Sequence, residues 1–125
     1  MSTIKVDSIQ TTGGVDQYTS KAWVNFNGTG TVAIRADGNV SSLTDNGAGR
    51  YQVNFSSNTP DASYSAQGNM RATGGGGNAQ VACLVEYNGF STLAVAMQTS
   101  SVRFCCITNT FNTNDSEYVG VNIVR

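Results

Sequence analysis

The sequence contains no histidine, a single proline and few charged residues, which make up 12% of its 125 residues. Without histidine, the chain lacks the Ser-His-Asp and Cys-His nucleophile systems, the usual proton carrier near pH 7 and the commonest zinc ligand. Seven basic residues against eight acidic ones give a net charge of −1. Nucleic acids and anionic membrane surfaces attract clustered Lys and Arg, so we expect no nucleic-acid partner.

Long apolar runs are also missing from the N-terminal segment. Its first ten residues place Ile4, Val6 and Ile9 between polar positions. We therefore expect no signal peptide and no membrane insertion, and a chain that is made in and released from a cytosol. The TTGG sequence at residues 11–14 interrupts this segment before any partner strand appears. Residues 1–20 are predicted to form an extended arm that docks elsewhere through these three apolar side chains.

The cysteines are too few and wrongly spaced for a disulfide framework or a zinc site, because only Cys83, Cys105 and Cys106 are present. Adjacent strand residues face opposite sides of a sheet, so we expect one of Cys105 and Cys106 in the core and the other partly exposed. The favoured interpretation is that all three are reduced structural residues.

What the sequence does contain favours strands and turns over helices. Apolar and polar residues alternate at Ala22, Val24 and Phe26, and most regularly at residues 50–55. Hairpin turns are predicted at residues 37–38 and 88–89, the latter between strands at 80–87 and 90–98. With about nine strands, residues 21–125 are predicted to form an all-β domain. Its architecture is an antiparallel β-sandwich, either jelly-roll-like or a meander.

Acidic residues were considered as catalytic and metal-binding groups. Asp115 and Glu117 lie two positions apart, and paired carboxylates can hydrolyse glycosidic bonds. Residues 45–47 and 112–115 offer oxygen ligands for calcium, without the spacing of a known calcium loop. Acids in turns more often bond the local backbone. We therefore predict no enzyme activity, no metal and no cofactor.

Trp23 faces away from the apolar side of its strand, which allows two roles. It could stack against a sugar, or it could be covered by another subunit. The second role is favoured, since exposed apolar surface beside a small core often marks an interface. Trp23 and Phe26 are therefore the predicted subunit-interface residues.

Several segments resemble a group of small bacteriophage virion proteins, found especially in phages of cyanobacteria and other aquatic bacteria. The similarity covers residues 1 to about 60, and the segments that carry it are STIKVDSIQ at 2–10, KAWVNFNGTGTVAIR at 21–35, NVSS at 39–42, DNG at 45–47 and NTPDASY at 58–64. Members of this group are described as tail fibre or related structural proteins. The resemblance implies a β-rich, trimeric virion component.

If every strand reverses direction, the loops divide between the two ends of the domain. One end then carries the arm, residues 37–38, 57–61, 88–89 and 108–116. The opposite end carries residues 27–30, 45–49, 73–78 and 98–101 and faces a host receptor. The predicted receptor-facing residues are Asn27, Asn46, Gly47, Gly75, Gly76, Asn78, Gln98 and Thr99.

Three functional hypotheses follow from the sequence. The leading one is a tail fibre or fibre-like appendage that docks on other virion proteins through its arm. It presents a homotrimeric β head to host surface polysaccharide. The second is a capsid decoration or cement protein that clamps the shell. The third is a carbohydrate-active enzyme that uses Asp115 or Glu117.

Overall fold

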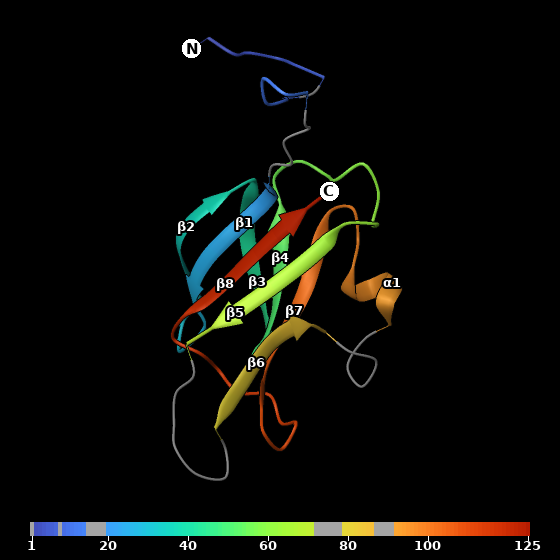
Figure 1. Ribbon diagram of the computed structural model, residues 1–125. Coiled ribbons are helices and arrows are strands. Elements are labelled where there is room, and N and C mark those ends of the chain that lie inside the picture. The colour runs from blue at the N-terminus through green and yellow to red at the C-terminus, as the bar shows by residue number, and fades with distance from the viewer. Residues whose placement is uncertain (1, 8, 15–19, 72–78, 87–91) are drawn as a thin grey trace.

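The structure of the 125-residue chain is a computed structural model that describes residues 2–7, 9–14, 20–71, 79–86 and 92–125. Two four-stranded antiparallel sheets pack face to face (Figure 1), which confirms the predicted all-β sandwich. Their orders are β2-β1-β8-β5 and β3-β4-β7-β6. The elements are β1 Ser20–Asn27, β2 Ala33–Gly38, β3 Val40–Gly47, β4 Arg50–Phe55, β5 Ser65–Met70, β6 Gln80–Val85, α1 Leu93–Ala96, β7 Ser101–Thr108 and β8 Val119–Val124.

The strand order excludes a simple meander. β8 lies between β1 and β5 in the first sheet, and β7 lies between β4 and β6 in the second. The hydroxyl of Ser20 in β1 therefore donates a hydrogen bond to Asn122 in β8, 2.5 Å away and 102 positions along the chain. The chain therefore crosses between the two sheets after β2, β4, β5 and β7.

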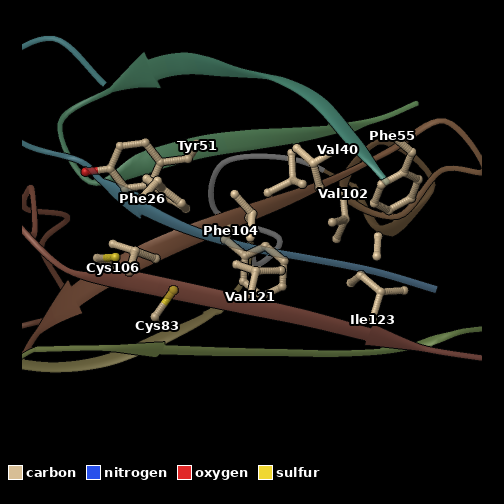
Figure 2. Packing of buried hydrophobic residues seen from close by; sticks show 14 of the residues in the cluster. Phe26, Val40, Tyr51, Phe55, Cys83, Val102, Phe104, Cys106, Val121 and Ile123 are labelled. Carbon is tan, nitrogen blue, oxygen red and sulfur yellow. The ribbon is translucent and has the colours of Figure 1, made fainter. Parts of the chain in front are cut away.

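Alternating side chains build the core between the sheets. In β4, Tyr51, Val53 and Phe55 are buried, while the residues between them are half-exposed. The ring of Phe26 meets the ring of Tyr51 edge-on, with centroids 5.0 Å apart (Figure 2). Burying a large apolar side chain contributes about 1.5–3 kcal/mol. The core residues Ala22, Val24, Val40, Tyr64, Val102, Phe104, Val119, Val121 and Ile123 complete this layer.

All three cysteines are buried, and none of them forms a disulfide within the described residues. Cys83 and Cys106 are opposite each other in the pairing of β6 with β7 and belong to the core (Figure 2). Cys105 faces the other side of β7, yet none of it is exposed, so the expected partial exposure is wrong. In the sheet it is flanked by Leu84 and Arg50, whose larger side chains stand on either side of the thiol.

One predicted turn and one predicted strand differ from the structure. Asp37 and Gly38 belong to β2, and no hairpin forms there, because β2 and β3 lie in different sheets. The chain instead changes sheets at Asn39, which has a positive φ of 56° and donates to the carbonyls of Lys21 and Ser57. The predicted strand at 90–98 is also wrong, since Leu93–Ala96 forms one helical turn. The hairpin turn at 88–89 lies outside the described residues.

Candidate functional site

The arm carries its three apolar side chains into solvent. Ile4, Val6 and Ile9 are 89%, 58% and 54% exposed. The amide of Gly14 donates to the carbonyl of Thr11 at 2.9 Å, so a tight turn forms where the TTGG sequence was expected to interrupt the segment. Residues 2–7 and 9–14 of the arm lie outside the sandwich (Figure 1), whereas Ser20 already belongs to β1. This segment therefore offers an apolar surface that the chain's own core does not cover.

The two residues predicted for a subunit interface lie on opposite sides of β1. Phe26 is wholly buried in the core of its own chain, so its assignment to an interface is wrong. Every second residue of the strand faces inward, and Phe26 shares that parity with Ala22 and Val24. Trp23 has the opposite parity and is 43% exposed on the outer face of the first sheet.

Beside Trp23, a groove of about 510 Å³ crosses β1, β8 and β5 on this outer face. Small-molecule sites typically have volumes of about 300–1,000 Å³. Two aromatic side chains, Trp23 and Tyr118, and four amide side chains line the groove, and none of its described lining residues is charged. The four amides belong to Asn25, Gln67, Asn69 and Asn122.

Glycine fixes the position of the tryptophan. Trp23 pairs with Gly38 across β1 and β2, and a Cβ on residue 38 would collide with Nε1 and Cδ1 of the indole. The ring can therefore lie over the backbone of β2. The absence of a side chain at residue 38 thus places the indole against β2, beside the groove.

The second aromatic ring is held by an arginine. The Arg35 guanidinium carbon lies 5.1 Å from the centre of the Tyr118 ring, within the range of a cation–π contact. Nη2 of Arg35 donates to the carbonyl of Glu117 at 2.7 Å. One face of the Tyr118 ring is thus occupied, while 47% of the residue stays exposed.

The amide side chains form two rows across the sheet. Trp23, Asn122 and Gln67 are paired in one row, and Asn25, Gly120 and Asn69 in the next. A Cβ on residue 120 would collide with Oδ1 of Asn69, so glycine lets this side chain lean over the groove floor. Within the described part of the chain, the side-chain amides of Gln67 and Asn69 have no hydrogen-bond partner. Each can both donate and accept.

The end of the sandwich opposite the arm, here called the far end, contains the β1–β2 connection, the β3–β4 turn and the loop at residues 109–118 (Figure 1). Three predicted receptor-facing residues, Asn27, Asn46 and Gly47, lie here. Oδ1 of Asn27 accepts from the amide of Thr29 at 2.9 Å, so this side chain is used by the turn itself. Gly75, Gly76 and Asn78 lie outside the described residues.

The placement of Gln98 and Thr99 at the far end is wrong. Tyr64 donates to the carbonyl of Gln98 at 2.9 Å, and Thr59 donates from its amide to the carbonyl of Thr99 at 2.9 Å. Both partners belong to the loop at residues 56–64, beside the start of β1 and the arm (Figure 1). Because residues 90–98 do not form a strand, every later loop changes ends, including residues 108–116, which reach the far end.

The acidic residues considered for catalysis have different surroundings. Oδ1 of Asp115 accepts from the amide of Gly49 at 2.7 Å and lies 3.0 Å from the hydroxyl of Tyr51. Burial, and then the Asp115 charge, raise the pKa of Tyr51 well above its ordinary value. Glu117 is exposed, and Asp45 accepts from the amide of Gly47 within its own turn. Among the described residues, no three His, Cys, Asp or Glu side chains gather as a metal site.

A buried ion pair lies on the outer face of the second sheet and was not predicted. The Glu86 side chain is completely buried, and its Oε1 is 2.7 Å from Nε of Arg50. Nη1 of Arg103 is 3.9 Å from Oε2 of Glu86. Nε of Arg103 donates to Gln52 at 2.9 Å, so the pair continues into a polar network. These contacts join β4, β6 and β7 and give Glu86 a structural role.

Sequence patterns alone missed most of the groove. Gln67 and Asn69 are far in the sequence from Tyr118 and Asn122, and both pairs are far from Trp23. They meet only because β8 inserts between β1 and β5. The one available signal was parity, since Gly120 and Asn122 alternate with the buried Val119, Val121 and Ile123 along β8. That alternation identifies an outward face without showing which strands adjoin it.

The chain matches no protein-family model, no curated protein and no solved structure. No helix in the described ranges is long and apolar enough to cross a membrane.

Proposed function

We propose that this chain is a structural attachment protein of a bacteriophage virion, a tail fibre or fibre-like appendage. Residues 1–20 dock on another virion protein, and the sandwich faces the polysaccharide of the host surface. The observation that carries the proposal is the exposure of Ile4, Val6 and Ile9, at 89%, 58% and 54%, on a segment outside the sandwich. Covering such apolar side chains with a partner is favourable. The resemblance of residues 1–60 to virion proteins supplies the virion context.

The head is proposed to be a homotrimer. Among the described strands, β2, β5, β3 and β6 form the edges of the two sheets, and exposed edges favour coverage by a neighbour. Several copies also raise the overall avidity of weak sites. Light scattering of the full chain and of a chain lacking residues 1–20 tests this assignment. A trimeric mass for both forms is expected, and a monomeric mass for the full chain contradicts it.

The attachment role is tested on phage particles. Immunogold labelling with an antibody against the sandwich should mark the tail or the five-fold vertices. Label spread over the whole capsid lattice would contradict attachment and favour a decoration protein. Absence of label from particles would reject a virion role altogether.

The arm is tested by substitution within the full-length chain. Replacing Ile4, Val6 and Ile9 together with serine should abolish co-sedimentation with particles. The matched control replaces Thr3 and Lys5 with alanine, since both are exposed polar residues of the same segment. Equal co-sedimentation of both variants would show that the apolar side chains are not the anchor.

A further inference from the structure

We propose that the groove between Trp23 and Tyr118 binds an uncharged saccharide. This inference deepens the proposed attachment function and rests on it, because it names the surface of the head that meets the host polysaccharide. The site lies on the face of the first sheet, and not on the loops of the far end that the sequence suggested.

The aromatic side chains give the first argument. Trp23 and Tyr118 are 43% and 47% exposed, and both line the same groove. The indole is fixed over Gly38, and the phenol ring is fixed by Arg35. Rigid, partly exposed rings lose little conformational entropy when a ligand stacks on them. The C–H face of a pyranose ring is a suitable partner for such surfaces.

The amides give the second argument. Asn69 and Gln67 lie across the groove floor without hydrogen-bond partners in the described part of the chain. An amide supplies an acceptor oxygen and two donor hydrogens, so it can bond neighbouring hydroxyls in either direction. The side-chain oxygen of Asn122 already accepts from Ser20, and its side-chain nitrogen has no hydrogen-bond partner among the described residues. Side chains of this kind match a ligand made largely of hydroxyl groups.

Charge selects an uncharged ligand. None of the described lining residues is ionised, and Arg35 at the rim is already bonded to the carbonyl of Glu117 and stacked on Tyr118. Among the described lining residues, no cation is present to neutralise an acidic ligand. A second copy of the chain is also a poor match, because a stable protein interface buries about 800 Å² on each partner around an apolar centre. Here the two aromatic rings are separated by amides.

Trp23 makes the experiment direct, because it is the one tryptophan in the sequence. Its fluorescence in the full-length protein is titrated with neutral oligosaccharides of glucose, mannose or galactose. A saturable change in emission is expected for at least one of them. Tyr118→Ala should weaken that binding by about tenfold, whereas Tyr118→Phe should preserve it because the ring remains.

Two further variants separate binding from folding. Gly120→Ala should also weaken binding, because the added methyl group displaces the Asn69 side chain from the floor. Phe111→Ala is the matched control, since Phe111 is an aromatic residue, 73% exposed, at the far end. Its binding should equal that of the unchanged protein. Each variant is first compared with the unchanged protein by urea unfolding, and only folded variants are titrated.

The outcomes divide clearly. Saccharide binding that is weakened in Tyr118→Ala and Gly120→Ala and unchanged in Phe111→Ala supports the proposal. No emission change with any oligosaccharide, or equal binding by all variants, overturns the assignment of saccharide binding to the groove. The attachment function is decided separately, by the labelling of particles. A change of oligomeric mass in Tyr118→Ala also overturns it, by assigning the groove to a subunit contact.

Discussion

The hydroxyl of Tyr51 occupies the space that a Cβ on residue 28 would need, and it lies 3.0 Å from the carbonyl oxygen of Gly28. The amide of Gly28 in turn donates to the carbonyl of Ser116 at 2.8 Å. Asp115, which also accepts from this hydroxyl, accepts from the amide of Gly49 in the β3–β4 turn, so three connections of the far end meet around one buried hydroxyl. The core and the far end are therefore coupled through a side chain that reaches from β4 to the first sheet.

Gly28→Ala is expected to destabilise the protein by about 1–3 kcal/mol, because the methyl group must displace Tyr51 or the backbone of Ser116. Urea unfolding measures the change. Gly13→Ala serves as the control, since a Cβ there meets nothing closer than 3.8 Å. Equal urea midpoints for the two variants would show that the far end accommodates the methyl group without loss of stability.

Tyr51→Phe should lower stability by about 1–2 kcal/mol at neutral pH, because the hydrogen bonds of the hydroxyl are lost. It should also reduce the loss of stability at alkaline pH. The pKa of Tyr51 is raised in the folded protein, so above pH 10 the unfolded chain releases this proton and the folded chain keeps it. Folding then weakens as the pH rises.

Unfolding at pH 8 and pH 11 measures this difference. Tyr64, whose pKa burial raises to about 12, contributes in the same direction and remains in the variant. Between pH 8 and pH 11, the Tyr118→Phe variant, altered at an exposed tyrosine, should lose as much stability as the unchanged protein. An identical alkaline response in Tyr51→Phe would contradict the assignment to Tyr51.

The ion pair of Asp61 with Arg125, at the end of the sandwich nearer the arm, should add an acid-sensitive contribution to folding stability. Nε and Nη2 of Arg125 donate to the two carboxylate oxygens at 2.9 and 2.6 Å. These bonds, and then the amide of Ser63, lower the pKa of Asp61 to about 2 from its ordinary value of 3.8. The contribution is complete above pH 3.8 and is lost as the pH falls toward 2.

Asp61→Asn should therefore reduce the difference in urea midpoint between pH 5 and pH 2.5. The expected effect is small, because the pair is exposed to water. Asp37→Asn provides a control, since Asp37 is exposed and forms no ion pair in the described structure. A difference that is unchanged in Asp61→Asn would show that the pair contributes nothing in solution.

Glu86→Ala should destabilise the protein by about 1–3 kcal/mol, because it leaves Arg50 and Arg103 without the buried carboxylate between them. Glu86→Gln should be milder, since an amide oxygen can still accept from Arg50. Thermal unfolding compares both with Glu117→Ala, an exposed acid. A Glu86→Ala variant as stable as Glu117→Ala would contradict a structural role for the pair.

The thiols should be unreactive in the folded protein. A hydrogen bond with Cys106, and then burial, raise the pKa of Cys83, and all three cysteines are buried. Only the thiolate reacts readily with a disulfide reagent. Labelling with 5,5′-dithiobis(2-nitrobenzoic acid) at pH 8 should modify none of them until denaturant is added, when all three react. Rapid labelling of the native protein would indicate that β6 and β7 separate easily.

Local sequence patterns predicted much of the fold. The alternation in β1 and β4 identified their buried residues, because a strand with one wet face has a period of two. The pattern could not show that β2 and β3 belong to different sheets. Asp-Gly at 37–38 is a typical hairpin sequence, but the bonds of Asn39 to Lys21 and Ser57 determine the actual crossing. These are tertiary contacts that no short window contains.

The candidate site was less predictable than the fold. Trp23 was recognised as outward-facing, and a sugar-stacking role was considered for it. Phe26 was assigned to an interface although its parity with Val24 places it in the core. Tyr118 and Asn69 reach the groove through β8 and β5, whose adjacency depends on the crossover order. One error at residues 90–98 was enough to move Gln98 and Thr99 to the wrong end.

The central position of β8 has a consequence for the order of folding. As the chain is synthesised, β1 and β5 are available long before the strand that must lie between them. The second sheet, which needs no residue beyond β7, can pair while the first still has an open gap. Contacts between distant residues also slow folding. We therefore expect the first sheet to form late, through a transient intermediate that exposes the inner faces of β1 and β5. Chains that associate through these faces before β8 is inserted would be trapped in a misfolded state.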